Sequence, residues 1–432
     1  MIDMKMACRI IGVLDNGTDG LTPYALNSIK EADVVIAGKR SLDLFKKIFL
    51  SSAIQYDLTG RLTQIPEWIT RAIAEKQQLV VLATGDPLCH GIAKYLIGKL
   101  GRDIFEVIPN VSTIQLACAR LGIAWQEIKI CSVHSRDTGE WVRGAEPSHG
   151  LYSLLQQLKQ HQKIVVFTSP ENSPARIARM LQIENLSAAF TISVVCNILQ
   201  KTESIIESLS IDEAAVKNFP DLNIVILQNK KKVEAPVLFG LEDSSFHQRK
   251  PDKGLITKRE VRVASLAFMK LRRDSIVWDI GAGSGSVGLE AARLCSDGHV
   301  YAIEKNEDDF VNALKNQQEM KLTNYTLLHN KAPQGIEHWM EPDAIFIGGS
   351  GGELAELITL GLQRLRRNGR LVMNFVTLEN MTGATQVLKE LGVAWSFTQI
   401  SVSRSQPILR MHRLAAENPV WIVTAQNITE QV

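Results

Sequence analysis

The sequence has no long hydrophobic run. No apolar stretch reaches the roughly 18 residues that a membrane-spanning helix needs. The first residues, MIDMKMACRIIGV, also lack the long apolar segment and the cleavage site of a secretory signal peptide. We therefore expect a cytoplasmic protein with no membrane partner.

Metal-binding patterns and strong net charge are absent too. The six cysteines are scattered, with no Cys-x-x-Cys pair and no Cys/His spacing suited to zinc, so we expect reduced thiols and no metal site. The formal net charge of +2 offers no broad basic field for nucleic acid. What is present is an apolar content of 45% over 432 residues, which predicts a globular enzyme of two or three domains.

Sequence patterns divide the chain into two α/β halves. Residues 1–232 alternate short β-rich runs with helical stretches, and residues 233–254 are charged and proline-bearing without sustained periodicity, which indicates a linker. Residues 255–432 contain seven predicted strands, and the last two are joined without an obvious helix, so they are expected to pair antiparallel. A parallel sheet with such an end is typical of methyltransferases, whereas a dinucleotide-binding domain usually continues in βα units.

A glycine loop follows the first predicted strand of the second half. The stretch VWDIGAGSGSVG, residues 277–288, fits both the dinucleotide pattern and the looser methyltransferase pattern, and Glu304 at the end of the next strand suits the ribose of either cofactor. Asp279 would repel a pyrophosphate at close range and attract the cationic S-adenosylmethionine. The loop therefore favours S-adenosylmethionine, with a dinucleotide or a turn that binds nothing as the alternatives.

Two further motifs follow predicted strands. Gly85-Asp86-Pro87 comes directly after LVVLAT, at the edge where α/β proteins bind ligands, although a surface turn has the same sequence. Residues 348–352, GGSGG, stand where amino-group methyltransferases carry an acidic or Asn-Pro-Pro-aromatic motif, so amine methylation is disfavoured. Glycines there would let a large flat ring approach the backbone, and a plain flexible loop is the alternative.

Several motifs, in order along the chain, resemble known families. The second half looks like the CbiT methyltransferases of cobalamin synthesis in its motifs ITKREVR, DIGAGSGS, AIEKN, NKAP and IFIGGSGGEL. The first half resembles CbiE, of the tetrapyrrole methylase family, in Leu21-Thr22-Pro23, ADVVIAGKR, LATGDP and IPNVSTIQLACARLG. One departure is the first loop, GVLDNGTDG, where many tetrapyrrole methylases have G-x-G-P-G. It leaves open the fine substrate contacts and the activity of the first half.

The resemblance implies a fold and an activity. The fold would be a two-lobed α/β tetrapyrrole methylase followed by a class I Rossmann-like methyltransferase with a seven-stranded sheet. The activity would be transfer of two methyl groups from S-adenosylmethionine, bound at two sites per chain, to precorrin-6Y or its cobalt form, with decarboxylation of an acetate arm. Both related families tend to associate, so a homo-oligomer is expected. The alternatives are an S-adenosylmethionine-dependent RNA methyltransferase and a non-catalytic tetrapyrrole-binding protein.

The resemblance also implies site residues. In the first half these are Gly85, Asp86, His90, Gly91, Ile92, Ser112 and Thr113. In the second half Thr257 would contact the cofactor, Glu304 its ribose and Ala332 its adenine. The amino-acid end would be held by Asp279, Gly281, Ala282, Gly283, Ser284 and Gly285, and the substrate would meet the loop Gly348, Gly349, Ser350 and Gly351.

Basic residues are candidates for the substrate carboxylates. Arg404, Arg410 and His412, with Arg413 beside them, lie in the predicted terminal hairpin, which could lie over the site or be an ordinary basic loop. Lys258, Arg259 and Arg262 have helical spacing. For Arg262 we expect a solvated helix face, and for the other two either that or a substrate contact.

Overall fold

The computed structural model describes residues 7–134, 137–231, 237–249, 256–350 and 352–427. Contacts group the chain into two compact units, Met1–Trp141 with His161–Val233, and Val142–Gln160 with Glu234–Val432. The predicted first domain, residues 1–232, therefore differs from the first unit at helix α6 (Tyr152–Gln160), which is grouped with the second. The predicted limits at residues 232 and 255 lie outside the described residues. Within the described residues, no helix is long and apolar enough to cross a membrane.

The first lobe of the first unit is a parallel sheet of order β3-β2-β4-β1-β5. Its strands are β1 (Cys8–Val13), β2 (Val34–Ala37), β3 (Ile54–Asp57), β4 (Leu79–Thr84) and β5 (Phe105–Ile108). Its helices are α1 (Pro23–Lys30), α2 (Lys39–Phe45), α3 (Ile65–Ala74) and α4 (Ile92–Leu100). Because the strands are parallel, their carboxyl ends share one edge, and the loops after β1, β4 and β5 meet there.

The second lobe has a mixed sheet of order β6-β7-β10-β8-β9, in which only the β6–β7 pair is parallel. Its strands are β6 (Lys129–Ser132), β7 (Lys163–Phe167), β8 (Phe190–Cys196), β9 (Ser204–Ser210) and β10 (Asn223–Asn229). Its helices are α5 (Thr113–Arg120), α7 (Pro174–Ile183) and α8 (Ile211–Val216). The predicted two-lobed α/β architecture of the first half is confirmed.

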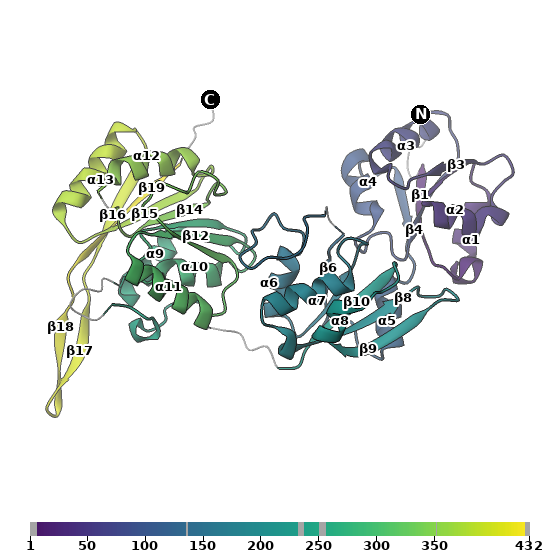
Figure 1. Ribbon diagram of the computed structural model, residues 1–432. Helices are drawn as coiled ribbons and strands as arrows, with labels where there is room; N and C mark the ends of the chain where they lie inside the picture. Colours follow the sequence, from purple (N-terminus) through teal and green to yellow (C-terminus); the bar gives the residue numbers. More distant parts are fainter. Residues whose placement is uncertain (1–6, 135–136, 232–236, 250–255, 351, 428–432) are drawn as a thin grey trace. The chain divides into compact units, whose positions relative to one another are not determined.

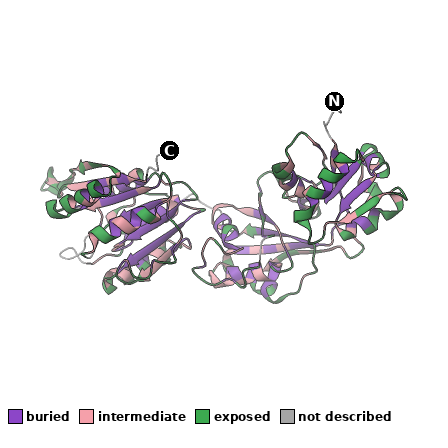
Figure 2. Ribbon diagram, turned by 90° about the horizontal axis from the view of Figure 1, so that it is seen from above, coloured by how far each residue is buried: buried purple, intermediate pink, exposed green. Residues whose placement is uncertain are grey.

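The second unit is built on a seven-stranded sheet of order β13-β12-β11-β14-β15-β19-β16. Its strands are β11 (Ile276–Ile280), β12 (His299–Glu304), β13 (Tyr325–His329), β14 (Ala344–Ile347), β15 (Arg370–Phe375), β16 (Ala394–Ile400) and β19 (Val420–Gln426). Strand β19 pairs antiparallel with β16, as predicted, and it also pairs antiparallel with β15. Buried clusters lie on both faces, under α9 (Arg259–Met269), α10 (Ser286–Leu294), α11 (Glu307–Glu319), α12 (Leu354–Arg364) and α13 (Leu378–Glu390). Figure 2 shows the strands buried and the outer helix faces exposed.

The connection between β16 and β19 is a further hairpin, of β17 (Ser403–Ile408) and β18 (Met411–Ala416). Figure 1 shows it extending from the seven-stranded sheet of this unit as a long arm. It exposes Leu409, Leu414 and Met411 to 95%, 75% and 65%. The sequence predicts the pairing of β16 with β19 but not this arm.

A segment that the sequence assigns to the linker packs against the second unit. We call residues 240–249 the strap. The backbone N–H groups of Gly240 and Leu241 donate to the carboxylate of Glu290 at 2.9 Å, and Phe246 is buried in the core. Only the linker residues on either side, 233–236 and 250–254, lie outside the described part of the chain.

Buried charge fixes the strap to α9 and α10. Arg262 is 0% exposed and donates to the Glu290 carboxylate at 3.0 Å, to Asp243 at 3.2 Å and to the carbonyls of Leu241 and Thr257. The expectation that Arg262 lies on a solvated helix face is therefore wrong. The helical spacing of the sequence could not show that Arg262 is buried, because its acidic partners come from the strap and from α10.

Candidate functional site

The glycine loop of the second unit joins β11 to α10 through backbone conformations that favour glycine. Gly281, Gly283 and Gly285 have φ of 72°, 57° and 77°, in the left-handed region. A Cβ on Gly281 would lie 2.4 Å from the carbonyl oxygen of Gly349, so the loop after β14 packs directly on this loop. A Cβ on Gly283 would meet nothing within 4 Å, which leaves that position open.

Glu304, at the end of β12, holds this loop in place. One carboxylate oxygen accepts the N–H of Gly283 at 2.8 Å, and the other accepts the N–H of Asn306 at 2.7 Å. Each oxygen keeps a second lone pair for a ligand hydroxyl. The residue predicted to bind ribose therefore also fixes the shape of the loop beside it.

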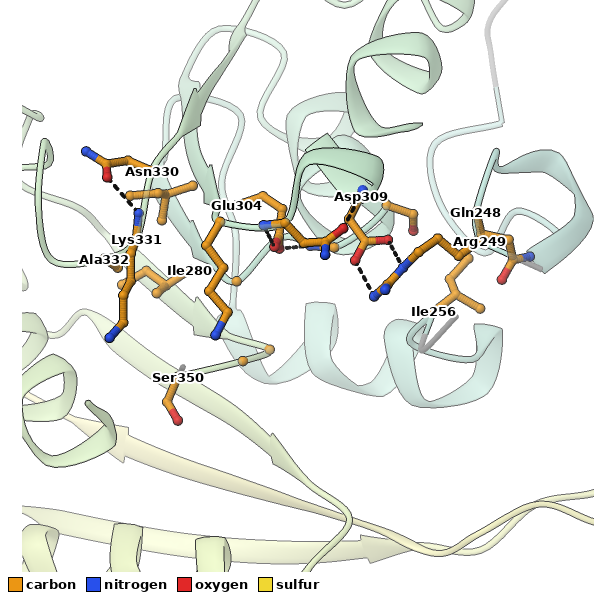
Figure 3. Close-up of a pocket in the computed structure, with 18 residues that line it drawn as sticks. Gln248, Arg249, Ile256, Ile280, Glu304, Asp309, Asn330, Lys331, Ala332 and Ser350 are labelled. Carbon is orange, nitrogen blue, oxygen red and sulfur yellow. Dashed lines mark hydrogen bonds and ion pairs between the residues drawn. The ribbon is translucent and has the colours of Figure 1, made fainter. Parts of the chain in front are cut away.

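A cavity of about 380 Å³ opens over the carboxyl ends of β11, β12 and β14 (Figure 3). Its size is in the range of small-molecule sites, roughly 300–1,000 Å³. It brings together eight predicted residues, namely Gly281, Gly283, Ser284, Glu304, Ala332, Gly348, Gly349 and Ser350. Gly351, predicted for the substrate loop, lies outside the described residues.

Four predicted residues do not line this cavity: Thr257, Asp279, Ala282 and Gly285. Thr257 follows Ile256, which does line it, and its carbonyl accepts from Arg262 at 2.7 Å. Ala282 and Gly285 shape the loop, because Ala282 N–H donates to Ile303 and Gly285 N–H to Ala282.

Asp279 lies beneath the loop rather than in the cavity. It is 1% exposed, and its Oδ2 accepts the N–H of Gly288 at 2.9 Å, while Oδ1 has no partner among the described residues. Burial raises the pKa of Asp279 to about 7, and Glu304 adds to the rise. A side chain that is partly neutral near pH 7 and covered by the loop does not act as the exposed charge that the sequence argument assumed.

Sequence reasoning missed several residues that line the cavity. They are Gln248, Arg249, Ile256, Ile280, Ile303, Lys305, Asn306, Asp309, Asn330 and Lys331. Those next to Glu304 and Ala332 could have been found from their position after strand ends. Gln248 and Arg249 could not, because they lie in the strap, which has no periodic pattern.

The basic candidates of the terminal hairpin are not brought to this cavity. Arg404 is held by Asp243 and Glu260, and the hydrogen bond to Glu260 raises the pKa of Arg404 further. His412 contacts Ser405, and Arg413 donates to Gln406 across the arm. Arg410 lies at the turn between β17 and β18, and none of the described residues of the arm lines the cavity.

In the first unit, three strand ends converge around Gly12. A Cβ there would lie 2.2 Å from the carbonyl oxygen of Gly85 and 2.8 Å from Cβ of Asn110. The Gly85 N–H donates to Val13 at 2.8 Å, and Gly85 has a φ of 69°. The loops after β1, β4 and β5 are therefore in direct backbone contact.

The residues predicted for the first site gather at this convergence. A Cβ on Gly85 would meet the N–H of Thr113 at 3.2 Å, and the Ser112 hydroxyl caps α5 through the N–H of Ile114. Asp86 accepts the N–H of Leu88 at 2.8 Å in a tight turn. The turn leads through Gly91, where a Cβ would lie 2.3 Å from the carbonyl oxygen of Pro87, to Ile92 at the start of α4.

His90 lies in the same turn, with a φ of 54°. Its ring is 5.6 Å from that of Phe167 on β7, so it bridges the two lobes of the first unit. Burial lowers the pKa of His90, and Lys94 lowers it further. The side chain is thus favoured in its neutral form.

The atypical first loop, residues 12–20, is closed by a side chain. The Asn110 amide donates to the carbonyls of Gly12 at 3.1 Å and Gly20 at 2.9 Å. Asp15 in the loop pairs with Arg40 at 3.3 Å and accepts from Gln200 at 2.6 Å. The loop that lacks the usual glycine pattern is therefore well ordered by polar contacts.

Comparisons with known proteins cover both units. Residues 8–214 match the family of tetrapyrrole (corrin/porphyrin) methylases, and residues 250–426 match a precorrin methyltransferase domain. A Sinorhizobium precorrin-6Y C(5,15)-methyltransferase (decarboxylating) is 28% identical over 406 residues, covering 92% of this chain and 91% of that protein. A probable cobalt-precorrin-6B C(15)-methyltransferase (decarboxylating) of Pyrobaculum calidifontis is 36% identical over 172 residues, covering 39% of this chain and 88% of that protein.

The chain belongs to the precorrin-6Y C(5,15)-methyltransferase (decarboxylating) family. The predicted resemblance is confirmed. Among solved structures, a precorrin-6Y C5,15-methyltransferase of Geobacter metallireducens is 36% identical, with a TM-score of 0.42, and covers 44% of this chain and 100% of that one.

The family and the fold support S-adenosylmethionine as the methyl donor, and the second unit fits it. The glycine loop leaves room for a close ligand, Glu304 offers acceptors for a ribose, and the cavity wall carries both signs of charge in Lys305, Arg249 and Asp309. Within the described residues, no group of three or more His, Cys, Asp or Glu side chains is placed to hold a metal ion.

Proposed function

We propose that this chain transfers two methyl groups from S-adenosylmethionine to precorrin-6Y, or its cobalt form, and decarboxylates an acetate arm of the ring. The observation that carries the proposal is the match, over 92% of the chain, to a relative whose name states both methylation positions and the decarboxylation. The two separate convergences of strand ends, one in each unit, support two methyl-transfer sites.

We assign one methylation to each unit according to the family that the unit matches. The first unit would methylate one meso carbon at the site around Gly85 and Ser112. The second unit would methylate the other at the cavity beside Glu304 and promote the decarboxylation. Each site uses its own loops, so changes in one should leave the other intact.

The residues of the second unit would act mainly by orientation. S-adenosylmethionine supplies a methyl group made electrophilic by its sulfonium. The loop from Gly281 to Gly285 and the Glu304 carboxylate would fix the donor, and the glycines at 348 and 349 would let a flat ring approach. Correct alignment and exclusion of water are together worth several kcal/mol of barrier, so an electron-rich ring carbon needs no strong base.

Loss of carbon dioxide breaks the bond between the carboxyl carbon and the acetate methylene, and the electron pair passes into the conjugated ring. A proton from solvent then adds to the methylene carbon, which becomes a methyl group. The protein's part would be to orient the carboxylate and favour the charge that develops on the ring. Arg404 is already held by Asp243 and Glu260, and the described residues of the arm do not line the cavity of their own unit. We therefore propose that Arg410 and His412 contact substrate carboxylates from the arm of a second copy.

A homo-oligomer is proposed as well. The apolar side chains at the tip of the β17–β18 arm, Leu409 above all, are exposed in the single chain and would be buried against a second copy. Light scattering coupled to size exclusion would show a mass above that of one chain, and Leu409→Ser with Leu414→Ser should lower it. The alternatives of an RNA methyltransferase or a non-catalytic binding protein have no support from the matched families.

A product assay tests the proposed function. Purified chain, precorrin-6Y and labelled S-adenosylmethionine should give a product that carries two labelled methyl groups and has lost one carbon dioxide. A product with one added methyl group would show that only one of the two units transfers a methyl group. An unchanged substrate would contradict the proposed function.

A further inference from the structure

Arg249 and Asp309 form an ion pair on the wall of the second unit's cavity. Arg249 Nε donates to one carboxylate oxygen of Asp309 at 2.9 Å, and Nη2 donates to the other at 2.6 Å. The side chains are 33% and 13% exposed, and both line the cavity (Figure 3). Among the described residues, the third guanidinium nitrogen, Nη1, has no protein acceptor.

The pair lies at the glycine-loop end of the cavity. Asn316 on α11 donates both to the carbonyl of Ser284 in that loop, at 2.9 Å, and to the carbonyl of His247 in the strap, at 3.0 Å. The strap therefore runs beside the loop where it presents Arg249. In Figure 3, Glu304 lies between this pair and Ala332.

The strap does not need the pair to stay in place. Glu290, Arg262 and the buried ring of Phe246 already anchor it. A partly buried ion pair costs desolvation free energy and often adds little stability. The wall of a binding cavity is thus an expensive place for a pair whose only role is structural.

The chemistry of the pair matches a zwitterion. An α-amino acid group carries one carboxylate and one ammonium, so an arginine and an aspartate side by side can bind both without leaving an uncompensated charge. The free Nη1 edge of Arg249 and the remaining lone pairs of Asp309 provide the hydrogen bonds. At the far side of Glu304, the wall around Ala332 is left for the adenine.

We propose that Arg249 and Asp309 hold the amino-acid end of the methyl donor, with Arg249 on its carboxylate and Asp309 on its ammonium. This inference rests on the proposed binding of S-adenosylmethionine in this cavity. It makes the strap, which the sequence assigns to a linker, a part of the second cofactor site. It also explains why the loop glycines need supply only shape.

Two ligands that differ only at that end test the proposal. S-adenosylhomocysteine keeps the amino-acid group, and 5′-methylthioadenosine has a methyl group in its place. Calorimetry on the full chain resolves the binding component that Glu304→Gln removes, which is assigned to this cavity. For that component, Arg249→Gln and Asp309→Asn should weaken S-adenosylhomocysteine roughly 10- to 100-fold and leave 5′-methylthioadenosine within about twofold.

Controls make the outcomes distinct. Arg272→Gln removes another arginine–aspartate pair of the same unit, on a side chain 64% exposed, and should change neither ligand. Arg249→Lys should recover part of the S-adenosylhomocysteine affinity. An equal loss for both ligands, or no loss for either, would overturn the proposal. If the wild-type cavity binds neither ligand, the proposed function of the second unit fails and the inference with it.

Discussion

The two sites hold their loops by different means. At the first, Gly12, Gly85 and Asn110 are in direct contact, and the neutral amide of Asn110 closes the atypical loop through two carbonyls. At the second, the Glu304 carboxylate accepts hydrogen bonds from the backbone N–H groups of Gly283 and Asn306. The buried ion pair of Arg262 and Glu290 fixes the strap. The first candidate site thus depends on neutral hydrogen bonds and the second on ionised groups.

The difference has a practical consequence. Substitutions that remove the charged groups of the second site should destabilise the second unit and leave the first unchanged. Loss of the neutral hydrogen bonds of Asn110 should affect the first unit and leave the second unchanged. pH should likewise act mainly on the second unit, where Asp279 is buried with a raised pKa. Four predictions test this contrast.

Arg262→Met should have the largest effect. It leaves Glu290, which is 0% exposed, without its cation, and breaking one side of a buried pair costs about 3–5 kcal/mol. Hydrogen exchange should show lowered protection throughout the second unit and unchanged protection in the first unit. The neighbour Arg259→Met, in a largely exposed pair, should cost less than about 1 kcal/mol. Equal losses for the two variants would contradict the account.

Asp279→Asn should change how stability depends on pH. The folded protein retains this proton up to a pH of about 7, while the unfolded chain loses it near 3.8. The stability contributed by this group is therefore present at low pH and lost as pH rises to about 7.

The variant lacks this loss. Its unfolding free energy, minus that of the wild type, should increase over this window by an amount on the order of a few kcal/mol. Urea unfolding of the second unit at a series of pH values measures the difference. A difference that stays flat between pH of about 4 and about 7 would exclude the raised pKa.

Gly281→Ala and Gly283→Ala form a matched pair. Both glycines have positive φ, but a Cβ on Gly281 would lie 2.4 Å from the Gly349 carbonyl, while one on Gly283 has open space. Gly281→Ala should lower the rate of the second methylation at least about 100-fold, which is equivalent to about 3 kcal/mol. Gly283→Ala should lower this rate less, because it adds only the backbone cost of a positive φ, about 1–2 kcal/mol. Labelled-methyl incorporation at each ring position measures both. The first methylation should be unchanged, and equal defects would argue against the close contact.

Asn110→Asp should have the smallest effect. It keeps the acceptor that takes the Val111 N–H at 2.8 Å but loses the donor to Gly12 and Gly20. Losing these bonds should cost about 1–2 kcal/mol and slow the first methylation roughly 10-fold. Asn330→Asp, which keeps the same bond to its own neighbour Lys331, serves as the control and should leave the first methylation unchanged. A first methylation unaffected by Asn110→Asp would show that the loop does not need this clasp.

Much of the fold could be predicted from the sequence because it follows from periodicity. Seven apolar runs separated by helical stretches predicted the second sheet, and the missing helix before residue 420 predicted its antiparallel end. The β17–β18 arm was missed because its residues are exposed on both faces, so no apolar alternation marks the strands. The strap was missed because its contacts are a single buried phenylalanine, Phe246, and hydrogen bonds to acidic residues far away in the sequence, such as Glu290. Neither leaves a periodic pattern in the sequence.

The site was predicted where backbone shape determines it. Glycines and strand-end acids such as Glu304 are visible in the sequence because their roles depend on local position. Arg249 was not, because its partner Asp309 is 60 residues away. The burial of Asp279 could not be predicted either, since nothing local shows that the loop covers it.

The central claim is that each unit binds its own cofactor independently. Calorimetric titration of the full chain with S-adenosylmethionine tests it most directly. The account predicts two binding events per chain in the wild type and one in Gly281→Ala, with the remaining event unchanged in affinity. A single event in the wild type, or the loss of both events in a folded Gly281→Ala protein, would contradict it.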